Sequence, residues 1–511
     1  MNILDCTLRD GGYYTDWDFS DAVLSSYLEA MDELPVDYVE VGYRNLPAND
    51  YLGRFGYTPV SVLERIRRQC GKKLAVMLNE KSTRVSDLDR LLSPVKEHVS
   101  LVRLAVAPDN VSRARKLAEE VKRMGFDVAF NLMYMSKWNG EYPGLFNQLR
   151  GVGDVVDVMY MVDSFGGVTP DVLQCVFNEL RTNVSCKIGF HGHNNMQLAL
   201  ANTIKAMELG VDTVDSTILG MGRGAGNLAT ELLLVYLNSH NRLEVDFNVL
   251  GNVVGTFNPL MEQYRWGTNL PYMIAGANQI PQKEVMDWVT NRVYSFNSVV
   301  RAVDNRRNKE VDNARYPLLE LHRRFENVIV VGGGQNASEH SEAVKSFVHS
   351  RKDVALVFAT SRQAASYLDM DVPKYYCLVG NEGRRHSHIV GQNQFDGICV
   401  LPPYPRLMGT EIPAYAQDRT YELPSIDFIG QYTDSVTSIA LQLALNLSSG
   451  NIYIVGYDGY SGGAVGEKEM VLTNENNAIF AAFAAYAGTP AIAITDSVYQ
   501  NLNVKSVYQY I

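Results

Sequence analysis

Two closely spaced histidines in a histidine-poor chain are the strongest chemical signal in the sequence. The stretch GFHGHNN covers residues 189–195, and the whole chain of 511 residues holds only 9 histidines. On an extended segment His191 and His193 point to the same side, because side chains alternate along a strand. Two imidazoles placed in this way can share one divalent metal ion. The plainer alternative is a pair of hydrogen-bonded histidines with no ion between them.

An arginine and an aspartate follow the first apolar segment and could complete such a site. Residues 4–14 read LDCTLRDGGYY, so Arg9 and Asp10 come directly after a predicted buried strand. One carboxylate and two imidazoles suit Mn²⁺ or Mg²⁺, with Co²⁺ or Zn²⁺ as alternatives. Arg9 would then need an anion between itself and the ion, which a bidentate oxyanion substrate supplies. The alternative for Arg9 and Asp10 is a simple salt bridge, which contributes little to stability where it is exposed.

The elements that must bring these residues together are eight short apolar runs separated by amphipathic helical stretches. The predicted strands are residues 2–7, 37–42, 73–78, 100–106, 127–133, 156–163, 187–191 and 212–218. Alternation of buried strands with helices predicts parallel strands joined by helical crossovers. The count of eight favours a (β/α)8 TIM barrel, although an open doubly wound sheet uses the same units. In a closed barrel only strand 8 separates strands 1 and 7, so Asp10 can lie beside His191 and His193.

Polar residues at the ends of the predicted strands favour the barrel, because a barrel places its chemistry at the carboxyl ends of its strands. These residues are Arg9, Asp10, Glu40, Asn79, Arg103, Asn131, Asp163, Ser164, His191, His193 and Thr217. A barrel with a purely structural role has no need of such a polar rim. We take Arg103 and Asn131 as candidates for substrate binding, whereas Asp163 and Ser164 could simply form the turn after their strand. Glu40 is a candidate catalytic group or a support for one.

Changes of pattern along the chain predict four segments. The barrel is expected over residues 1–230, and a helical extension of it over residues 231–303. The polar stretch DNRRNKEVDNARYP begins a predicted linker at residues 304–324. Residues 325–511 then show the strands and helices typical of a second α/β domain with an open, Rossmann-like sheet.

The second domain contains a glycine-rich turn, VVGGGQNASEH, at residues 330–340 between a predicted strand and a predicted helix. Such a turn can present backbone N–H groups to a phosphate. It lacks the G-x-G-x-x-G spacing, and a tight turn with Asn336 or Ser338 as helix cap is nearly as good an interpretation. A nucleotide or sugar-phosphate ligand and a partner enzyme are therefore two hypotheses for residues 325–511.

The composition argues against several classes of function. Lys and Arg total 46 against 57 Asp and Glu, and this net charge of −11 argues against nonspecific binding to nucleic acid or to an anionic membrane. The 6 cysteines are scattered without a C-x-x-C pair, as in a reduced cytoplasmic protein. The sequence shows no transmembrane run and no signal-peptide pattern. We expect a cytoplasmic protein and leave homo-oligomerisation open.

Several ordered motifs resemble those of the DRE-TIM metallolyase superfamily. They are TLRDGG, VEVG, VDSFGGVTP, HGHNN and GMGRGAGNLATE, spread over about residues 1–290. The superfamily includes 4-hydroxy-2-oxovalerate aldolase, hydroxymethylglutaryl-CoA lyase, and the isopropylmalate and homocitrate synthases. The resemblance implies that Asp10, His191 and His193 are metal ligands. It places Asn227 where some members have a further ligand. It also implies that Asp163 and Ser164 lie near the substrate, as candidates for substrate binding.

Within the superfamily the sequence is most similar to the aldolase branch. The loop GMGRGAGN resembles GLGAGAGN of that branch, and no cysteine of the CoA-lyase kind occurs between Cys186 and Cys377. RDGGYY also differs from the RDGEQ of the CoA-dependent synthases. The resemblance therefore implies cleavage or formation of a 4-hydroxy-2-oxo acid through a pyruvate-type enolate that Arg9 stabilises. The alternatives are Claisen condensation of an acyl-CoA, and a non-catalytic protein that binds metal and a 2-oxo acid.

The general base is the role that the sequence leaves open. The hydroxyoxovalerate aldolases carry a histidine three residues after the aspartate, where this chain has Tyr13. Tyrosine has a pKa of about 10 and needs help to act as a base at neutral pH. Tyr13 is therefore a candidate for orienting the substrate or donating a proton. Glu40 or a metal-bound hydroxide is a candidate base.

Overall fold

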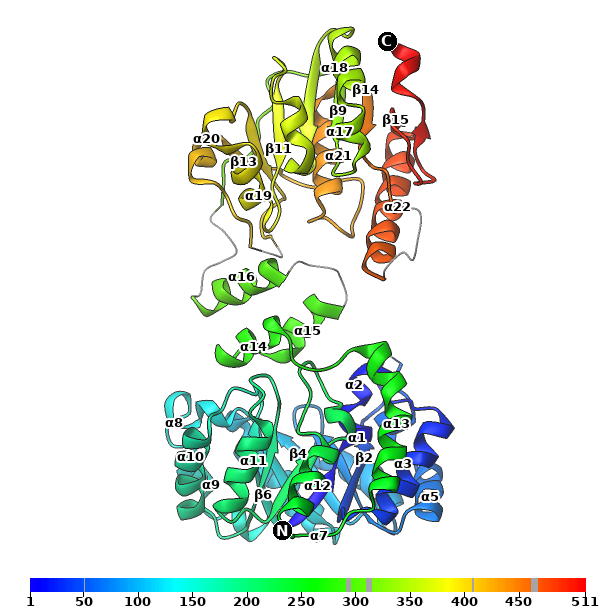
Figure 1. The fold of residues 1–511 in the computed structure, drawn as a ribbon. Helices are drawn as coiled ribbons and strands as arrows, with labels where there is room; N and C mark the ends of the chain where they lie inside the picture. The colour runs from blue at the N-terminus through cyan, green and yellow to red at the C-terminus, as the bar shows by residue number, and fades with distance from the viewer. Residues whose placement is uncertain (50, 291–295, 309–314, 407–408, 461–466) are drawn as a thin grey trace. The chain divides into compact units, whose positions relative to one another are not determined.

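The computed structural model describes residues 1–49, 51–290, 296–308, 315–406, 409–460 and 467–511. These residues form two compact units, Met1–Met286 and Asp287–Ile511 (Figure 1). Each unit is built on its own set of parallel strands.

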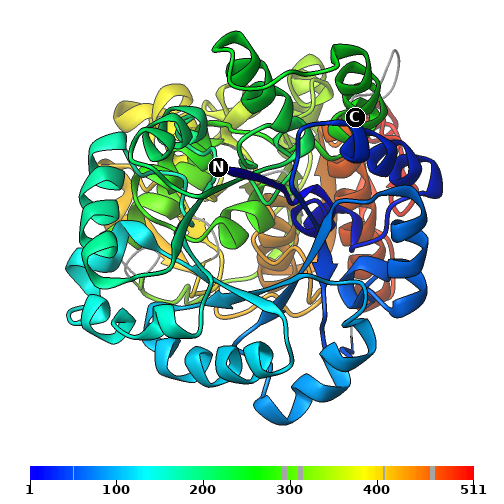
Figure 2. The same ribbon diagram turned by 90° about the horizontal axis from the view of Figure 1, so that it is seen from below.

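The first unit is a closed barrel in which eight parallel strands follow one another in chain order. The strands are β1 (Asn2–Asp5), β2 (Tyr38–Tyr43), β3 (Lys73–Asn79), β4 (Leu101–Val106), β5 (Asp127–Leu132), β6 (Val158–Asp163), β7 (Lys187–Gly192) and β8 (Thr213–Ser216). Nearly all strand residues are buried, because one face fills the barrel interior and the other packs against the helices. The predicted (β/α)8 barrel is confirmed, and Figure 2 shows the helices arranged around the strands.

Helices follow the strands of the first unit. The longer ones are α3 (Asp21–Glu33), α5 (Val60–Gln69), α7 (Val111–Arg123), α10 (Pro170–Asn183), α11 (Ala199–Glu208), α12 (Thr230–Ser239), α13 (Phe247–Tyr264) and α14 (Leu270–Ala277). The shorter ones are α1 (Thr7–Asp10), α2 (Gly12–Thr15), α4 (Arg54–Tyr57), α6 (Leu88–Leu92), α8 (Trp138–Glu141) and α9 (Leu145–Leu149). In α7 the buried residues are Val111, Ala114, Leu117, Ala118 and Val121. This spacing gives the single apolar stripe of a helix that packs on one side.

The first strand ends earlier than the sequence predicts. β1 stops at Asp5, and Thr7–Asp10 form the helical turn α1. The Asp5 carboxylate favours this turn, because it accepts hydrogen bonds from the backbone N–H of Thr7 at 2.9 Å and from its hydroxyl at 2.6 Å. Arg9 and Asp10 are therefore presented by a helical turn that follows the strand, and not by the strand itself.

The second unit contains eight parallel strands in the order β13-β12-β11-β10-β9-β14-β15-β16. They are β9 (Phe325–Val331), β10 (Val354–Phe358), β11 (Lys374–Cys377), β12 (Ile398–Leu401), β13 (Thr420–Glu422), β14 (Ser448–Val455), β15 (Ile492–Ala493) and β16 (Asn503–Val504). Val328 and Val330 of β9 pack into one apolar cluster, whereas Ile329 and Val331 pack into another. The sheet is thus covered on both faces, and its topological switch lies between β9 and β14. The predicted open, Rossmann-like domain is confirmed.

Helices flank this second sheet. They are α16 (Phe296–Arg307), α17 (Asn336–Glu339), α18 (Ser341–His349), α19 (Glu382–Ile389), α20 (Gly391–Gln394), α21 (Val436–Leu447) and α22 (Glu467–Ala487), while α15 (Gln282–Thr290) spans the division between the units. Among the helices that the structure describes, none combines the length and the apolar character needed to cross a membrane.

The division between the units differs from the predicted domain boundaries. Helices α12, α13 and α14 belong to the first unit, whereas α16 belongs to the second and reaches into the predicted linker at 304–324. An ion pair of 2.6 Å between Arg301 on α16 and Glu411 ties this helix to the second unit. The predicted segment 231–303 is helical where it is described, and the division between the two units falls within it. Residues 309–314 of the predicted linker lie outside the described residues.

Asp5 joins the first strand to other parts of the barrel, and its loss should destabilise the fold. The carboxylate is fully buried and accepts hydrogen bonds from Thr7, Tyr27 and Thr230. Asp5→Ala leaves these buried donors without an acceptor, so we expect the free energy of unfolding to fall by about 3–5 kcal/mol. Urea unfolding followed by tryptophan fluorescence measures it, and the exposed Asp109→Ala variant is the control. A loss below about 1 kcal/mol in Asp5→Ala would contradict this account.

Candidate active site

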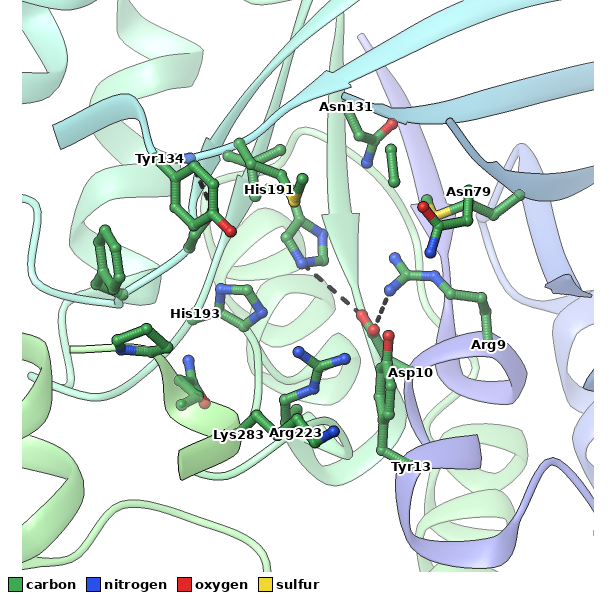
Figure 3. Close-up of a pocket in the computed structure, with 18 of the residues that line it drawn as sticks. Arg9, Asp10, Tyr13, Asn79, Asn131, Tyr134, His191, His193, Arg223 and Lys283 are labelled. Carbon is green, nitrogen blue, oxygen red and sulfur yellow. Dashed lines mark hydrogen bonds and ion pairs between the residues drawn. The ribbon is translucent and has the colours of Figure 1, made fainter. Parts of the chain in front are cut away.

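A cavity of about 280 Å³ lies at the carboxyl ends of the barrel strands (Figure 3). Its polar walls are formed by Arg9, Asp10, Tyr13, Tyr43, Asn79, Asn131, Tyr134, Ser164, His191, His193, Arg223, Gln282 and Lys283. The apolar residues of the wall are Met77, Ala105, Met133, Val162, Phe165 and Pro281. The structure thus brings together eight of the residues singled out from the sequence, namely Arg9, Asp10, Tyr13, Asn79, Asn131, Ser164, His191 and His193. Glu40, Arg103, Asp163 and Asn227 lie behind these walls.

Hydrogen bonds fix the orientations of the two histidine rings. Nδ1 of His191 lies 2.9 Å from a carboxylate oxygen of Asp215, and Nδ1 of His193 lies 2.7 Å from the backbone oxygen of Asp163. Nε2 is therefore the ring nitrogen left for a ligand in each case, and the ring centroids are 5.0 Å apart. Burial, together with the neighbouring His191, lowers the pKa of His193 to about 3. His193 is thus a neutral imidazole, which is the form that binds metal ions.

Asp10 lies next to the histidines, and Asn227 supports it. Oδ2 of Asp10 is 3.7 Å from Nε2 of His191 and accepts a hydrogen bond of 2.8 Å from Nδ2 of Asn227. Burial alone would raise the pKa of Asp10, but the Arg9 guanidinium and the histidines hold this pKa below its usual range. Oδ1 of Asn227 is buried without a hydrogen-bond partner in the part of the chain that the structure describes. Buried polar atoms are rarely left unpaired, so this oxygen is available to a further ligand.

These donors fit a divalent cation. They comprise a carboxylate, two imidazole nitrogens and an unpartnered amide oxygen, a mixed set that suits Mn²⁺ or Mg²⁺. A second group of donor atoms, from Cys6, His191 and Asp215, lies within 4.8 Å of one another. Burial raises the pKa of the Cys6 thiol, and Arg103 already binds the carboxylate of Asp215. The side of His191 that faces Asp10 is therefore the better metal site.

A buried network of charges lies beneath the cavity. Oε2 of Glu40 accepts hydrogen bonds from Nε of Arg9 at 2.8 Å and from Nη1 of Arg103 at 2.9 Å. Glu40 and Arg103 are both fully buried, because side chains from within a barrel strand point into its interior below the strand ends. Neither reaches the cavity, so the structure does not place Arg103 as a substrate ligand or Glu40 as a base. Glu40 instead orients Arg9.

The other three substrate-binding candidates differ in position. The carboxylate of Asp163 accepts a hydrogen bond from the backbone N–H of Val168 at 3.1 Å, so it closes the loop after β6. Through its backbone oxygen, Asp163 positions His193 and does not face the cavity. Ser164 and Asn131 do line the cavity, as their predicted role requires.

Three residues of this region escaped the sequence reasoning. The Tyr43 hydroxyl lies 2.9 Å from that of Tyr13, and the Arg223 guanidinium lies 3.8 Å from the centre of the Tyr13 ring. Asp215 supports His191 and Arg103 from inside β8. The charge of Arg223 inside the glycine-rich loop GMGRGAGN could have indicated from the sequence that this residue belongs to the site. Tyr43 and Asp215 gave none, because an apolar strand pattern does not show which side chains meet inside a barrel.

Comparisons with known proteins agree with this geometry. A family model described as HMGL-like matches residues 1–251. A 4-hydroxy-2-oxovalerate aldolase of Chloroflexus aurantiacus is 30% identical over 242 residues, which cover 46% of this chain and 68% of the relative. The chain belongs to the HMGL-like family. The resemblance to the DRE-TIM metallolyases is thereby confirmed, and the protein is a member of a lyase family.

Two further matches show the range of the similarity. An oxaloacetate decarboxylase of Mycobacterium tuberculosis is 26% identical over 244 residues, covering 47% of this chain and 71% of the relative. A crystal structure of the N-terminal domain of a Bacteroides vulgatus protein, provisionally named an aldolase, is 57% identical with a TM-score of 0.57. That match covers 59% of this chain and 100% of the other. None of the three reported relatives covers the whole chain, so the family assignment concerns its N-terminal part.

The second unit has a cavity of its own, of about 1040 Å³, after strands β9, β10, β11 and β14. The N–H groups of Gly332 and Gly334 in the glycine-rich turn donate to backbone oxygens at 2.8 Å each, and that of Asn336 donates to Asp458 at 2.9 Å. These amides are engaged within the chain, so they do not form the predicted phosphate cradle. A nucleotide or sugar-phosphate ligand of this unit, and a partner enzyme, stay predictions.

The buried carboxyl of Asp163 should make the free energy of unfolding of the protein depend on pH. Burial raises the pKa of Asp163 from its ordinary value of 3.8 to about 6, so the native state binds its proton more tightly than the unfolded chain does. The protonated carboxyl of Asp163 therefore adds to the free energy of unfolding below about pH 4. This contribution is lost as pH rises to about 6. Relative to Asp163→Asn, we expect the wild type to lose about 2–3 kcal/mol over this range.

Urea unfolding at several pH values between about 4 and 7 measures this difference. Asp171→Asn, at an exposed position in the first turn of α10, is the matched control and should follow the wild type. A pH profile of Asp163→Asn that runs parallel to the wild type would show that Asp163 does not titrate in this range.

Proposed function

We propose that the protein is a divalent-metal-dependent aldolase that cleaves or forms a 4-hydroxy-2-oxo acid through a pyruvate-type enolate. The observation that carries the proposal is the meeting of Asp10, both histidines and the free oxygen of Asn227 beside Arg9. Mn²⁺ or Mg²⁺ is the proposed ion, with a small 2-oxo acid as substrate. When bound, the ion supplies a Lewis acid that withdraws electrons from the 2-oxo group.

Arg9 is proposed to hold the negative charge that develops in the reaction. Asp10 binds its Nη1 and Glu40 binds its Nε, which fixes the guanidinium and leaves Nη2 to donate into the cavity. In aldol cleavage the bond between C3 and C4 breaks, and its electron pair is shared between C3 and the oxygen on C2. A guanidinium that is already oriented stabilises this oxyanion without reorganising. A proton then adds to C3 to complete pyruvate.

The Tyr13–Tyr43 pair is proposed to handle the proton of the C4 hydroxyl. Tyr13 lines the cavity, and the hydrogen bond of 2.9 Å between the two phenol oxygens offers a route along which a proton moves. Arg223 above the Tyr13 ring stabilises negative charge on this ring during the transfer. Glu40 is too deep for this role, because it is fully buried behind Arg9.

Decarboxylation of a 2-oxo acid with a carboxylate on C3 is a second candidate function. The similarity to an oxaloacetate decarboxylase favours it. Loss of carbon dioxide gives the same pyruvate enolate, so Arg9 and the metal ligands would serve it unchanged. The reaction breaks no O–H bond and needs no base at Tyr13, which separates the two candidates.

Exchange of the pyruvate methyl protons for deuterium tests the proposed site. By NMR in deuterated water, we expect exchange with Mg²⁺ that stops when a chelator removes the ion. Asp10→Ala and Arg9→Ala should each slow exchange at least about 100-fold, because one loses a ligand and the other the oxyanion donor. Arg123→Ala, whose side chain is 73% exposed on α7, should exchange like the wild type. No exchange despite metal binding would favour acyl-CoA substrates or a non-catalytic role.

Tyr13→Phe tests the proposed proton route. This variant should slow cleavage of 4-hydroxy-2-oxopentanoate about 100-fold, because the C4 hydroxyl loses its proton acceptor. Decarboxylation of oxaloacetate by the same variant should stay within about threefold of the wild type. Tyr14→Phe is a matched control, since the Tyr14 hydroxyl faces the backbone oxygen of Gly224 at 3.3 Å. Equal losses in both reactions would show that Tyr13 acts on the enolate and not on the hydroxyl.

A further inference from the structure

Arg223 is a cation of the cavity wall that has no counter-ion among the residues that the structure describes. The loop that carries it turns at Gly224 and Gly226, where φ is 63° and 77°, a backbone conformation that glycine adopts without strain. The side chain is half-buried and lies over the ring of Tyr13, as Figure 3 shows from the labelled residues. Among the described residues, no carboxylate forms an ion pair with its guanidinium.

The charges of the cavity are opposite in sign to those of the whole chain. Acidic residues outnumber basic ones by 57 to 46 overall. The described residues of the wall, in contrast, include the cations Arg9, Arg223 and Lys283 and the single carboxylate of Asp10. Arg9 already binds that carboxylate. A partly buried cation that lacks a partner loses hydration without compensation, so the site is completed by an anion from outside.

The proposed reaction identifies the part of the substrate that meets Arg223. The carboxylate and keto oxygen of the pyruvate half belong at the end where Arg9, Asp10 and the histidines meet. Arg223 stands over Tyr13, the residue proposed to contact the C4 hydroxyl, so it lies toward the other half of the substrate. That half is the fragment released as an aldehyde or ketone.

We propose that this fragment carries a second anionic group, a carboxylate or a phosphate, which Arg223 binds with the help of Lys283. The inference rests on the proposed aldolase function. The C3–C4 bond breaks, and its electron pair stays with the pyruvate half. The hydroxyl proton passes to Tyr13 as the phenol proton of Tyr13 moves to Tyr43 and a proton of Tyr43 leaves to water. The second product is then an anionic aldehyde or 2-oxo acid. A neutral aldehyde such as acetaldehyde leaves the guanidinium without a partner and is a poor substrate.

A matched pair of 2-oxo acids tests the inference by binding alone. 2-Oxoglutarate and 2-oxopentanoate have the same chain length, and only the first has a second carboxylate. By calorimetry with Mn²⁺-loaded protein, we expect 2-oxoglutarate to bind at least about 30-fold more tightly. Arg223→Gln should remove most of this advantage, Lys283→Ala a smaller part, and Arg123→Ala none. An equal affinity for both acids, or an advantage that survives in Arg223→Gln, would overturn the inference.

Condensation of pyruvate with different aldehydes separates carboxylate from phosphate as the anion. Glyoxylate and glyceraldehyde 3-phosphate are the two anionic probes, and acetaldehyde is the neutral one. We expect one anionic aldehyde to be preferred in kcat/KM by about 30-fold or more, and Arg223→Gln to remove this preference by lowering kcat/KM far more for this aldehyde than for acetaldehyde. Equal use of all three aldehydes would overturn the inference.

A failure of the proposed aldolase function and a failure of the inference about Arg223 appear in different experiments. Pyruvate methyl exchange needs no second reactant, so its absence in the wild type counts against enolate formation and not against Arg223. The calorimetric comparison needs no turnover and still decides whether Arg223 selects a second anionic group.

Discussion

The barrel depends on a set of buried charges that must all be paired. Arg9, Glu40, Arg103, Asp215 and His191 form a continuous chain of ion pairs and hydrogen bonds inside it. In a low-dielectric interior, an unpaired charge costs several kcal/mol. Each member therefore holds its neighbours in one arrangement. Arg9 and His191, which end this chain at the cavity, are oriented before any ligand arrives.

The atoms that the network leaves unpaired define the chemistry of the cavity. Nδ1 of each histidine is engaged from behind, so Nε2 remains for a ligand. The carboxylate of Asp10 is shared with Arg9 and Asn227. The amide oxygen of Asn227 is buried and has no hydrogen-bond partner within the described ranges. This end of the cavity suits a metal ion and the enolate of a 2-oxo acid. Arg223 leaves positive charge at the side of Tyr13, so the two halves of a substrate would meet different surroundings.

Membership of the HMGL-like family and the geometry answer different questions. The family and its barrel indicate lyase chemistry, whereas named relatives include both aldolases and an oxaloacetate decarboxylase. These reactions share an enolate and differ in the group that leaves it. In the proposed function, the residues that decide between these reactions are those away from the proposed metal ligands, chiefly Tyr13, Tyr43 and Arg223. The second unit adds a cavity at the switch point of its sheet, where open α/β folds bind their ligands.

The sequence by itself determined the barrel, the pairing of His191 with His193, and the position of Asp10 beside them. These follow from local patterns, since strand periodicity and the closure of eight units leave little freedom in placing strand ends. The sequence did not show how deep inside the barrel each polar strand residue lies. It placed Arg103 at the rim, whereas the structure buries this side chain completely below the cavity. It also did not show that α1 carries Arg9 and Asp10, or that Tyr43 meets Tyr13. Only the tertiary structure decided these points, because they depend on side chains that are distant in sequence and compete for the same buried space.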